Sequence, residues 1–140
     1  MELQELSDRM EIREVITRYT RAIDTRSFDD LDHVFADGAI LDYSSVDGPV
    51  APLSEARPWV IDGLSLFTRY QHTIGQVAID FDGPDKARAT AYFVNPLVMT
   101  DPEGKEILWE VGGYYHHDLV RTADGWRSVR MVDENIYSRF

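Results

Sequence analysis

The stretch from Lys86 to Met99, KARATAYFVNPLVM, decides the fold class, because it reads as one long β-strand. Successive side chains on a strand point to opposite faces, so every second residue shares a face. One face carries Ala87, Ala89, Ala91, Phe93, Asn95, Leu97 and Met99. The usual strand has ~5–6 residues, and longer strands coil, so this stretch predicts a curved sheet.

Turn sequences separate this strand from further strands on both sides. The strands are predicted over Arg69–Phe81, Lys86–Met99, Ile107–Arg121 and Trp126–Tyr137. The turns between them are Asp82-Gly83-Pro84-Asp85, Asp101-Pro102-Glu103-Gly104 and Thr122-Ala123-Asp124-Gly125. Long strands joined by Asp-Gly or Pro-Gly turns predict an antiparallel meander.

Helical patterns precede the strands. The apolar stripe of a first helix is formed by Ile12, Val15, Ile16, Tyr19, Ala22 and Ile23. Ser7 or Asp8 is its expected cap, with Glu11 completing a capping box after Asp8. A second, short helix is predicted from a cap at Ser27, with an apolar face of Leu31, Val34 and Phe35 and an end at Gly38.

The middle of the chain connects these helices to the meander. A short strand is predicted over Ala39–Tyr43, and a proline-rich loop or lid over Asp47–Pro58. A helical turn or two is expected over Trp59–Phe67. Helices followed by a long antiparallel sheet predict a single α+β domain over residues 1–140. We expect a cone-shaped barrel whose helices close an apolar pocket.

Composition excludes several classes of function. The 140 residues carry 14 basic and 25 acidic side chains, a net charge of −11, which argues against nucleic acid and anionic membranes as partners. Cysteine is absent, so disulfides and thiolate chemistry are excluded. The N-terminus lacks the basic start and apolar run of a signal peptide, and no apolar stretch is long enough to span a bilayer. A cytoplasmic location is the expectation.

His72 and Asp24 are the leading candidates for acid–base chemistry. His72 begins a long strand with Tyr70 and Ile74 on its own face, and imidazole is the natural base near neutral pH. Asp24 ends the first helix, where a carboxylate meets the negative end of the helix dipole and needs a compensating partner. The alternatives are a structural strand histidine and a solvated helix end paired with Arg21 or Arg26.

Three further polar residues fall on apolar faces. Tyr19 lies in the helix stripe, Tyr43 ends the first short strand, and Asn95 interrupts the apolar face of Lys86–Met99. A buried hydroxyl or amide needs a hydrogen-bond partner, which a ligand in a pocket can supply. The alternatives are that the tyrosines fill core space and that Asn95 marks a bulge.

The sequence Gly112-Gly113-Tyr114-Tyr115-His116-His117 leaves two orientations open. Simple alternation sends His117 inward, whereas a bulge at the paired glycines would send Tyr114 and His116 inward. Adjacent histidines point apart on a strand, so they make a poor metal site, and no metal is expected.

The order of these pieces resembles the SnoaL-like branch of the nuclear-transport-factor-2-like superfamily, and within it the group of scytalone dehydratase, bile acid 7α-dehydratase and lindane dehydrochlorinase. The resemblance rests on Ile16–Arg26, Phe28–Leu31, Leu41-Asp42-Tyr43, Gln71-His72-Thr73-Ile74-Gly75 and Gly125-Trp126-Arg127. It implies a cone-shaped barrel with an apolar pocket and a cofactor-free histidine–aspartate dyad. His72 and Asp24 match the dyad, and Tyr19 and Tyr43 match catalytic tyrosines of two of these relatives.

The resemblance also bears on the remaining site residues and the substrate. It favours His116 over His117 as the inward residue and makes His116 and Tyr114 candidate substrate-binding residues. Asn95 is a third candidate, because of its place on the apolar face of its strand. Asn95-Pro96-Leu97 stands where scytalone dehydratase has a second active-site histidine, so scytalone itself is not expected as the substrate. The implied function is a cofactor-free dehydratase-like lyase acting on a small, largely apolar cyclic molecule of steroid, terpenoid or polyketide type. The alternatives are a double-bond isomerase, a non-catalytic binding module and a pure oligomerisation domain, and a homodimer or homotrimer is expected.

Overall fold

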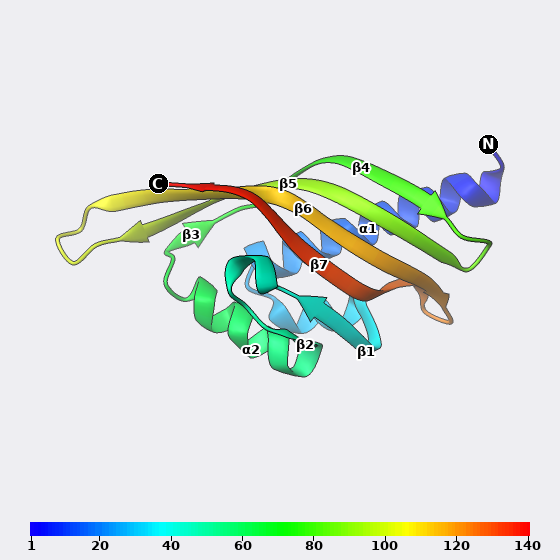
Figure 1. Ribbon diagram of the computed structural model, residues 1–140, viewed down its shortest axis with the longest axis horizontal. Coiled ribbons are helices and arrows are strands. Elements are labelled where there is room, and N and C mark those ends of the chain that lie inside the picture. Colours follow the sequence, from blue (N-terminus) through cyan, green and yellow to red (C-terminus); the bar gives the residue numbers. More distant parts are fainter.

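A long, curved sheet and the helices against its inner side make up the fold, and the computed structural model describes all residues from Met1 to Phe140 (Figure 1). The elements in chain order are α1 (Leu3–Asp24), the 3₁₀ helix η1 (Phe28–His33), β1 (Phe35–Asp42), the 3₁₀ helix η2 (Ser44–Val46), β2 (Val50–Pro52), α2 (Leu53–Leu64), β3 (Arg69–Tyr70), β4 (Thr73–Phe81), β5 (Lys86–Thr100), β6 (Glu106–Thr122) and β7 (Gly125–Arg139). Helices lead and long strands follow, which confirms the predicted α+β class. No helix combines the length and apolar character needed to cross a bilayer.

The sheet is mixed rather than wholly antiparallel. Strands β4, β5, β6 and β7 each pair antiparallel with the next, as the turn sequences predict. β1 instead lies parallel to β7, which gives the strand order β2-β1-β7-β6-β5-β3 with β4 also paired to β5. The predicted short strand therefore joins the meander at its far side and extends it.

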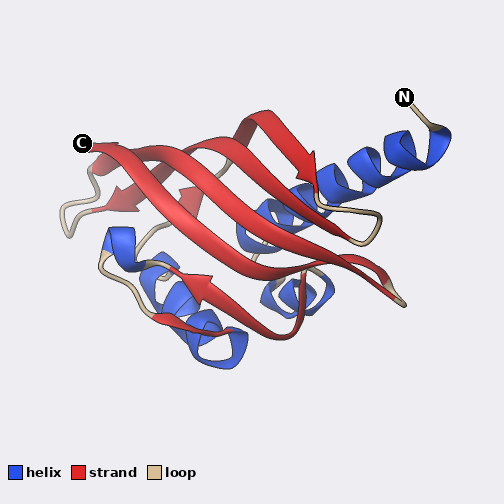
Figure 2. Cartoon of the chain, turned by 45° about the vertical axis from the view of Figure 1, so that its right-hand side comes forward, coloured by secondary structure: helices blue, strands red, loops and turns tan.

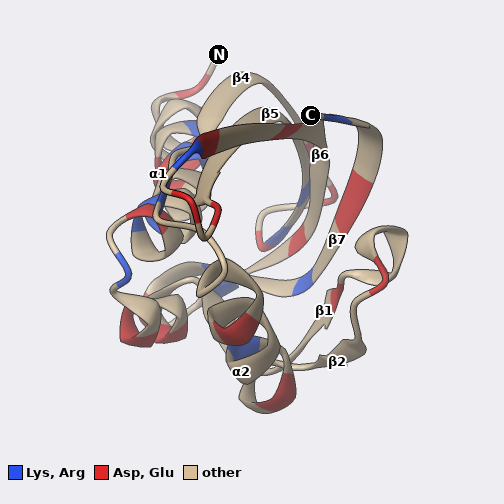
Figure 3. Cartoon of the chain, turned by 90° about the vertical axis from the view of Figure 1, so that its left-hand side faces the viewer, with Lys and Arg blue, Asp and Glu red and all other residues tan.

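The sheet is curved but does not close on itself, and helices complete the cone as predicted. Figure 3, viewed from one end, shows the sheet curling from β4 round to β7 and β1. Its two edges, β2 on one side and β3 with β4 on the other, do not pair with each other. Of these edge strands β2 has three residues and β3 has two, whereas β4 has nine. Instead, α1 contacts β4 and β7, and α2 contacts β1 and β2, so helices complete the wall (Figure 2).

The inner face of β5 explains how closely α1 approaches the sheet. Ala87, Ala89 and Ala91 are buried in the same apolar cluster as the α1 residues Ile12 and Ile16. A methyl side chain leaves room that a larger residue would occupy, and interiors are close-packed. The small residues on this face therefore leave room for the α1 side chains in the shared core.

The start of α1 differs from the prediction. The helix begins at Leu3 with Glu2 at its cap position, so neither Ser7 nor Asp8 caps it. Asp8 lies buried within the helix, and the predicted capping-box residue Glu11 accepts a hydrogen bond from the backbone N–H of Trp126 at 2.7 Å. Both carboxylates therefore bind residues far away in the sequence instead of capping the helix.

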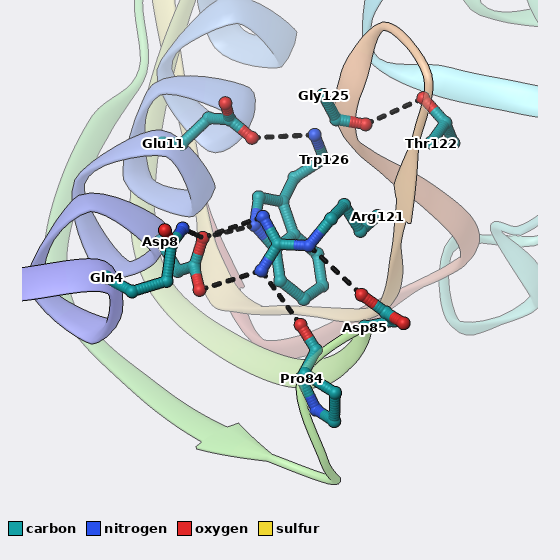
Figure 4. Close-up of polar contacts among 9 residues, drawn as sticks. All are labelled: Gln4, Asp8, Glu11, Pro84, Asp85, Arg121, Thr122, Gly125 and Trp126. Atoms are coloured by element: carbon teal, nitrogen blue, oxygen red, sulfur yellow. Dashed lines mark hydrogen bonds and ion pairs between the residues drawn. The ribbon is translucent and has the colours of Figure 1, made fainter.

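Figure 4 shows the network that these carboxylates form. Arg121 donates to both oxygens of Asp8, at 3.0 and 2.9 Å, and the indole N–H of Trp126 donates to Oδ1 at 3.0 Å. Arg121 also donates to Asp85 at 3.1 Å and to the carbonyl of Pro84 at 2.8 Å. The network fixes the N-terminal half of α1 against the β4–β5 turn and the end of β6, and so orients the whole helix.

Two other predicted boundaries shift. Residues 28–33 form a 3₁₀ helix rather than an α-helix, and β1 begins at Phe35 instead of Ala39. Gly38 does not end a helix but lies inside β1 with φ +78°, within the register shift between Phe35 and Ile40. A positive φ favours glycine, so Gly38 allows the backbone conformation that the bulge requires.

The predicted loop or lid over Asp47–Pro58 is largely regular structure. It contains β2 and the first half of α2, and Pro58 lies inside the helix. An interior proline removes a helix hydrogen bond. Burial of Ala56 and Val60 on either side of Pro58 holds the helix in place, and the helix ends at Leu64, three residues before the predicted Phe67.

The strand predicted over Arg69–Phe81 is interrupted, and the interruption matters for the site. β3 ends at Tyr70 and β4 begins at Thr73, so Gln71 and His72 lie between strands. The backbone N–H of His72 is therefore free of the sheet ladder and donates to Oδ2 of Asp24 at 2.8 Å. The break directs His72 toward the end of α1.

Candidate active site

The side chains of His72 and Asp24 meet at the end of α1. Nδ1 of His72 lies 2.6 Å from Oδ1 of Asp24, while Oδ2 accepts from the His72 backbone. A carboxylate only accepts hydrogen bonds, so the neutral ring donates from Nδ1 and carries its lone pair on Nε2. This two-point contact fixes both the orientation and the tautomer of the imidazole.

The imidazole lies in aromatic surroundings. Its ring centroid is 6.2 Å from those of Phe93 and Tyr115, and its side chain is 3% exposed. Asp24, at 14% exposure, also borders a polar cleft lined by Thr17, Thr20, Arg21 and Gln71. The pair therefore separates a solvent-open cleft from the interior, with the carboxylate on the outer side.

A largely apolar cavity of about 280 Å³ lies on the inner side of His72. Side chains from α1, α2, the inner face of the sheet and the connecting segments line it. Its apolar and aromatic wall includes Ile23, Val46, Trp59, Val60, Leu64, Phe67, Leu97, Trp109, Val111 and Tyr115. Such a wall, interrupted by a few polar groups, is typical of a small-molecule site.

Tyr19 and Tyr43 also line this cavity and bind each other. Their hydroxyl oxygens are 2.6 Å apart, and both side chains are buried. Burial raises the pKa of both phenols above 10, so each remains a proton donor. One hydroxyl donates to the other, which leaves the second proton available to a ligand.

Several buried polar atoms at the cavity have no partner in the protein. They are Oδ1 of Asn95, Nε1 of Trp109 and Oδ1 of Asp133. An unpaired buried polar atom costs ~1–3 kcal/mol, and most such atoms in proteins are satisfied. A polar ligand is the natural partner for a group of them around one cavity.

The expectation that His116 and Tyr114 face the pocket is wrong. His116 lies on the outer face of the sheet, where Thr90 and Glu134 bind its two ring nitrogens at 2.9 and 3.1 Å. Tyr114 packs edge-on against Tyr92 on the same face. The pairing of β5 with β6 is continuous through the two glycines, and the register shift beside them places the extra residue, Ile136, on β7. Alternation along β6 is therefore unbroken.

His117 consequently points inward, but it belongs to the core. It is 2% exposed, its Nδ1 lies 2.9 Å from the Ser128 hydroxyl, and it does not line the cavity. Burial lowers the pKa of His117 to about 4, so the ring is neutral at pH 7. The structure assigns it a packing role.

Asp133 is the cavity residue that the sequence did not reveal. Counting every second residue from buried Trp126 would place Arg130 and Val132 inward and Asp133 outward. A register shift between Ser128 and Arg130 reverses this order and turns Met131 and Asp133 inward. No sequence pattern marked that bulge.

The donor groups around the cavity do not suit a metal ion. No three histidine, aspartate or glutamate side chains come together in the molecule. The site instead combines an oriented imidazole, a pair of phenols and an apolar wall, which are groups for acid–base chemistry or small-molecule binding.

A helix-covered, open curved sheet around an apolar cavity is the architecture of SnoaL-like α+β proteins. The chain belongs to this family, since the SnoaL-like domain model matches residues 4–132. An uncharacterized protein of Mycobacterium tuberculosis is 34% identical over 139 residues, which are 99% of this chain and 92% of that one.

Solved structures share the architecture. A Kribbella flavida protein superposes with a TM-score of 0.86 at 28% identity, over 96% of this chain and 95% of that one. A protein of Novosphingobium aromaticivorans described as a putative scytalone dehydratase gives 0.87 at 14% identity, over 99% and 91%. A hexachlorocyclohexane dehydrochlorinase of Novosphingobium barchaimii gives 0.82 at 16%, over 99% and 93%. The last two similarities show the fold, as the resemblance implied.

Proposed function

We propose that this protein is a cofactor-free lyase of the dehydratase type, in which His72 removes a proton from a small, largely apolar cyclic substrate. One observation carries the proposal: Nδ1 of His72 is held 2.6 Å from Asp24 while the ring borders the apolar cavity. A base in this position has a fixed direction of attack, and Asp24 acts through it as a positioning residue.

Nε2 of His72 is the atom that accepts the proton. In a cyclic β-hydroxyketone it takes the hydrogen from the carbon between the carbonyl and the hydroxyl-bearing carbon. The electrons of the C–H bond form the new double bond, and the C–O bond to the hydroxyl breaks. The imidazolium returns its proton to the departing oxygen, so water leaves and the base is regenerated.

The tyrosine pair supports the same step. Removing a proton next to a carbonyl builds negative charge on the carbonyl oxygen, and a preorganised donor in a water-poor cavity stabilises it. Tyr19 and Tyr43 offer one free phenolic proton between them at the cavity wall. Because both hydroxyls are buried before substrate arrives, little reorganisation is needed.

The cavity wall defines the class of substrate. A volume of about 280 Å³ with predominantly apolar lining fits a compact ring system bearing few polar groups. The similar folds of a putative scytalone dehydratase and a hexachlorocyclohexane dehydrochlorinase support an elimination, because both names describe one.

Exchange of hydrogen for deuterium in 2-tetralone, a bicyclic ketone, tests the base directly. We expect the wild-type protein in D₂O to accelerate exchange at the carbons beside the carbonyl, followed by ¹H NMR. His72→Ala should reduce the acceleration by about 10²-fold or more, the usual contribution of a general base. His33→Gln, at an exposed histidine of η1, is the matched control and should keep the full rate.

Cyclic β-hydroxyketones separate elimination from the alternatives. Elimination forms a conjugated enone, which is followed by its ultraviolet absorbance. Movement of the double bond of a cyclic β,γ-unsaturated ketone into conjugation, with no loss of water from the β-hydroxyketone, would identify an isomerase. Thermal stabilisation by these ketones without exchange or turnover would identify a binding module and contradict the proposed lyase.

A further inference from the structure

The carboxyl group of Asp133 is an unsatisfied polar group on the cavity wall. Its residue is 8% exposed, it lines the cavity, and its buried Oδ1 has no hydrogen-bond partner. Its backbone carbonyl, by contrast, accepts from the Ser45 hydroxyl at 2.5 Å, which fixes the strand at this point. The chain thus holds the residue in place but leaves its side chain unpaired.

The groups that face Asp133 are neutral or acidic. Tyr19 from α1, Tyr43 after β1, and Tyr115 on β6 all lie close enough for its charge to raise their pKa values. The nearby carboxylate of Asp42 on β1 adds further repulsion, and Arg130 pairs with Asp42 at 3.6 Å. No cation in the protein compensates Asp133.

We propose that Asp133 is the substrate-recognition residue of this cavity, a neutral carboxylic acid that donates a hydrogen bond to an oxygen atom of the bound molecule. This inference deepens the proposed function and rests on it for the identity of that oxygen, a carbonyl or hydroxyl of the cyclic substrate. The inference requires that the substrate carry an oxygen atom, which the His72–Asp24 pair alone does not require. An apolar ring without oxygen would leave the carboxyl of Asp133 unpaired.

The protonation state of Asp133 agrees with this role. Burial, with a smaller contribution from Asp42, raises the pKa of its carboxyl from 3.8 to about 7. At and below neutral pH a large fraction of the protein therefore carries a carboxyl O–H at the cavity. An acid kept neutral by apolar surroundings is an effective hydrogen-bond donor.

A cationic ligand is the competing occupant, since an ionised carboxylate would attract an amine. The largely apolar wall disfavours it, because two free acceptors, Oδ1 of Asn95 and Oδ1 of Asp133, do not replace the water around an ammonium group. A ketone oxygen needs only one or two donors, which Asp133 and the tyrosine pair provide. The structure thus favours an oxygen-bearing neutral molecule.

Three probes of one shape test the proposal: 2-tetralone, tetralin and 2-aminotetralin. Their affinities are measured at pH 6 through the fluorescence of Trp59 and Trp109, which line the cavity. We expect wild-type protein to bind the ketone about tenfold more tightly than the hydrocarbon, as one well-placed hydrogen bond provides. Asp133→Leu should remove most of this preference, whereas Asp133→Asn, which still donates, should keep it.

Glu134→Gln is the matched control, because Glu134 is the next residue of β7 and points to the outer face toward His116. It should leave the ratio of affinities unchanged. Raising the pH from 6 to 8 should weaken ketone binding in the wild type and not in Asp133→Asn. All other side chains are the same in both proteins, so the difference between them reports on residue 133. The proposal is overturned if Asp133→Leu keeps the wild-type ratio, if the amine binds best, or if no probe binds.

The outcome for Asp133 is distinguishable from that for the lyase. Loss of ketone preference in Asp133→Leu with no effect of His72→Ala on exchange would leave recognition standing and contradict the chemistry. The converse result would retain the base and remove Asp133 from the site. Circular dichroism confirms folding of each variant, and Asp133→Leu should fold, because it replaces an unpaired buried acid with an apolar side chain of similar size.

Discussion

His72 Nδ1 lies 2.6 Å from Asp24 Oδ1, although the two residues are 48 positions apart in the chain. The contact depends on the end of α1 and on the break between β3 and β4. One carboxylate holds both the ring and the backbone of the same histidine, which makes the imidazole a rigid part of the cavity wall.

Replacing the positioning carboxylate should impair chemistry more than binding. In Asp24→Asn the amide nitrogen is a donor, so it disfavours the tautomer that leaves the lone pair on Nε2. We expect the rate of 2-tetralone exchange to fall by roughly 10–10²-fold with little change in ketone affinity. Asp24→Glu, which retains the carboxylate, should recover part of the rate. Equal losses of rate and affinity in both variants would indicate a structural role.

The tyrosine pair should behave as a single donor. Tyr19→Phe and Tyr43→Phe each remove one member of the 2.6 Å contact, and either change disturbs the free proton that faces the cavity. We expect losses of roughly 10²-fold in the exchange rate for the single variants and little further loss in the double variant. Fully additive effects, measured in the same NMR assay, would show that the two phenols act independently.

Asp133 should make the folded state less stable as the pH rises. Its pKa is about 7 in the folded protein and near 3.8 when unfolded, so the folded state binds more protons between these values. Stability is then greatest below about pH 4 for this group and decreases until about pH 7, by up to about 4 kcal/mol. Asp133→Asn removes the dependence, so urea denaturation at pH 8 should show the variant to be more stable. A variant that is less stable at pH 8 than the wild type would contradict this account.

Asp8 should show the opposite pH dependence. Hydrogen bonds from Arg121 are the main cause that lowers its pKa from 3.8 to about 2, and its side chain is 9% exposed. The stabilisation is present above pH 4 and is lost as the pH falls through 2, amounting to about 2 kcal/mol. Asp8→Asn should therefore reduce the free energy of unfolding at pH 7 by about this amount, with the difference disappearing near pH 2. Glu14→Gln, at an exposed residue of the same helix, is the control for the denaturation series.

Gly48 should be intolerant of any side chain. A Cβ atom there would lie 2.6 Å from the indole of Trp59 and 2.6 Å from Cβ of Tyr43, two residues of the cavity wall. Gly48→Ala must therefore displace one of them, and we expect ketone affinity to fall roughly tenfold, as loss of one good contact implies. Gly75→Ala, whose added Cβ meets only an ordinary contact at 3.6 Å, should bind normally. Unchanged ketone affinity in Gly48→Ala would show that Trp59 and Tyr43 can move aside without weakening the binding site.

Much of the architecture followed from local patterns. The long strands of the meander, their turns and the buried stripe of α1 were predictable, because alternation and helical periodicity act through neighbouring residues. The boundaries near Pro58 and Gly38 were not, since packing of α2 and the β1–β7 register outweigh local preference there. The role of Asp8 was also not predictable, because its carboxylate binds Arg121 instead of capping the helix.

The sequence by itself determined which chemistry is present: an imidazole, a carboxylate, two tyrosines and an amide on otherwise apolar faces, with no cysteine. Only the tertiary structure decided which of them share a cavity. It brought His72, Tyr19, Tyr43 and Asn95 together, placed Tyr114 and His116 outside, and turned Asp133 inward. The reason is that a single residue added to one strand by a bulge reverses the face of every residue beyond it, and bulges are set by the pairing of distant strands.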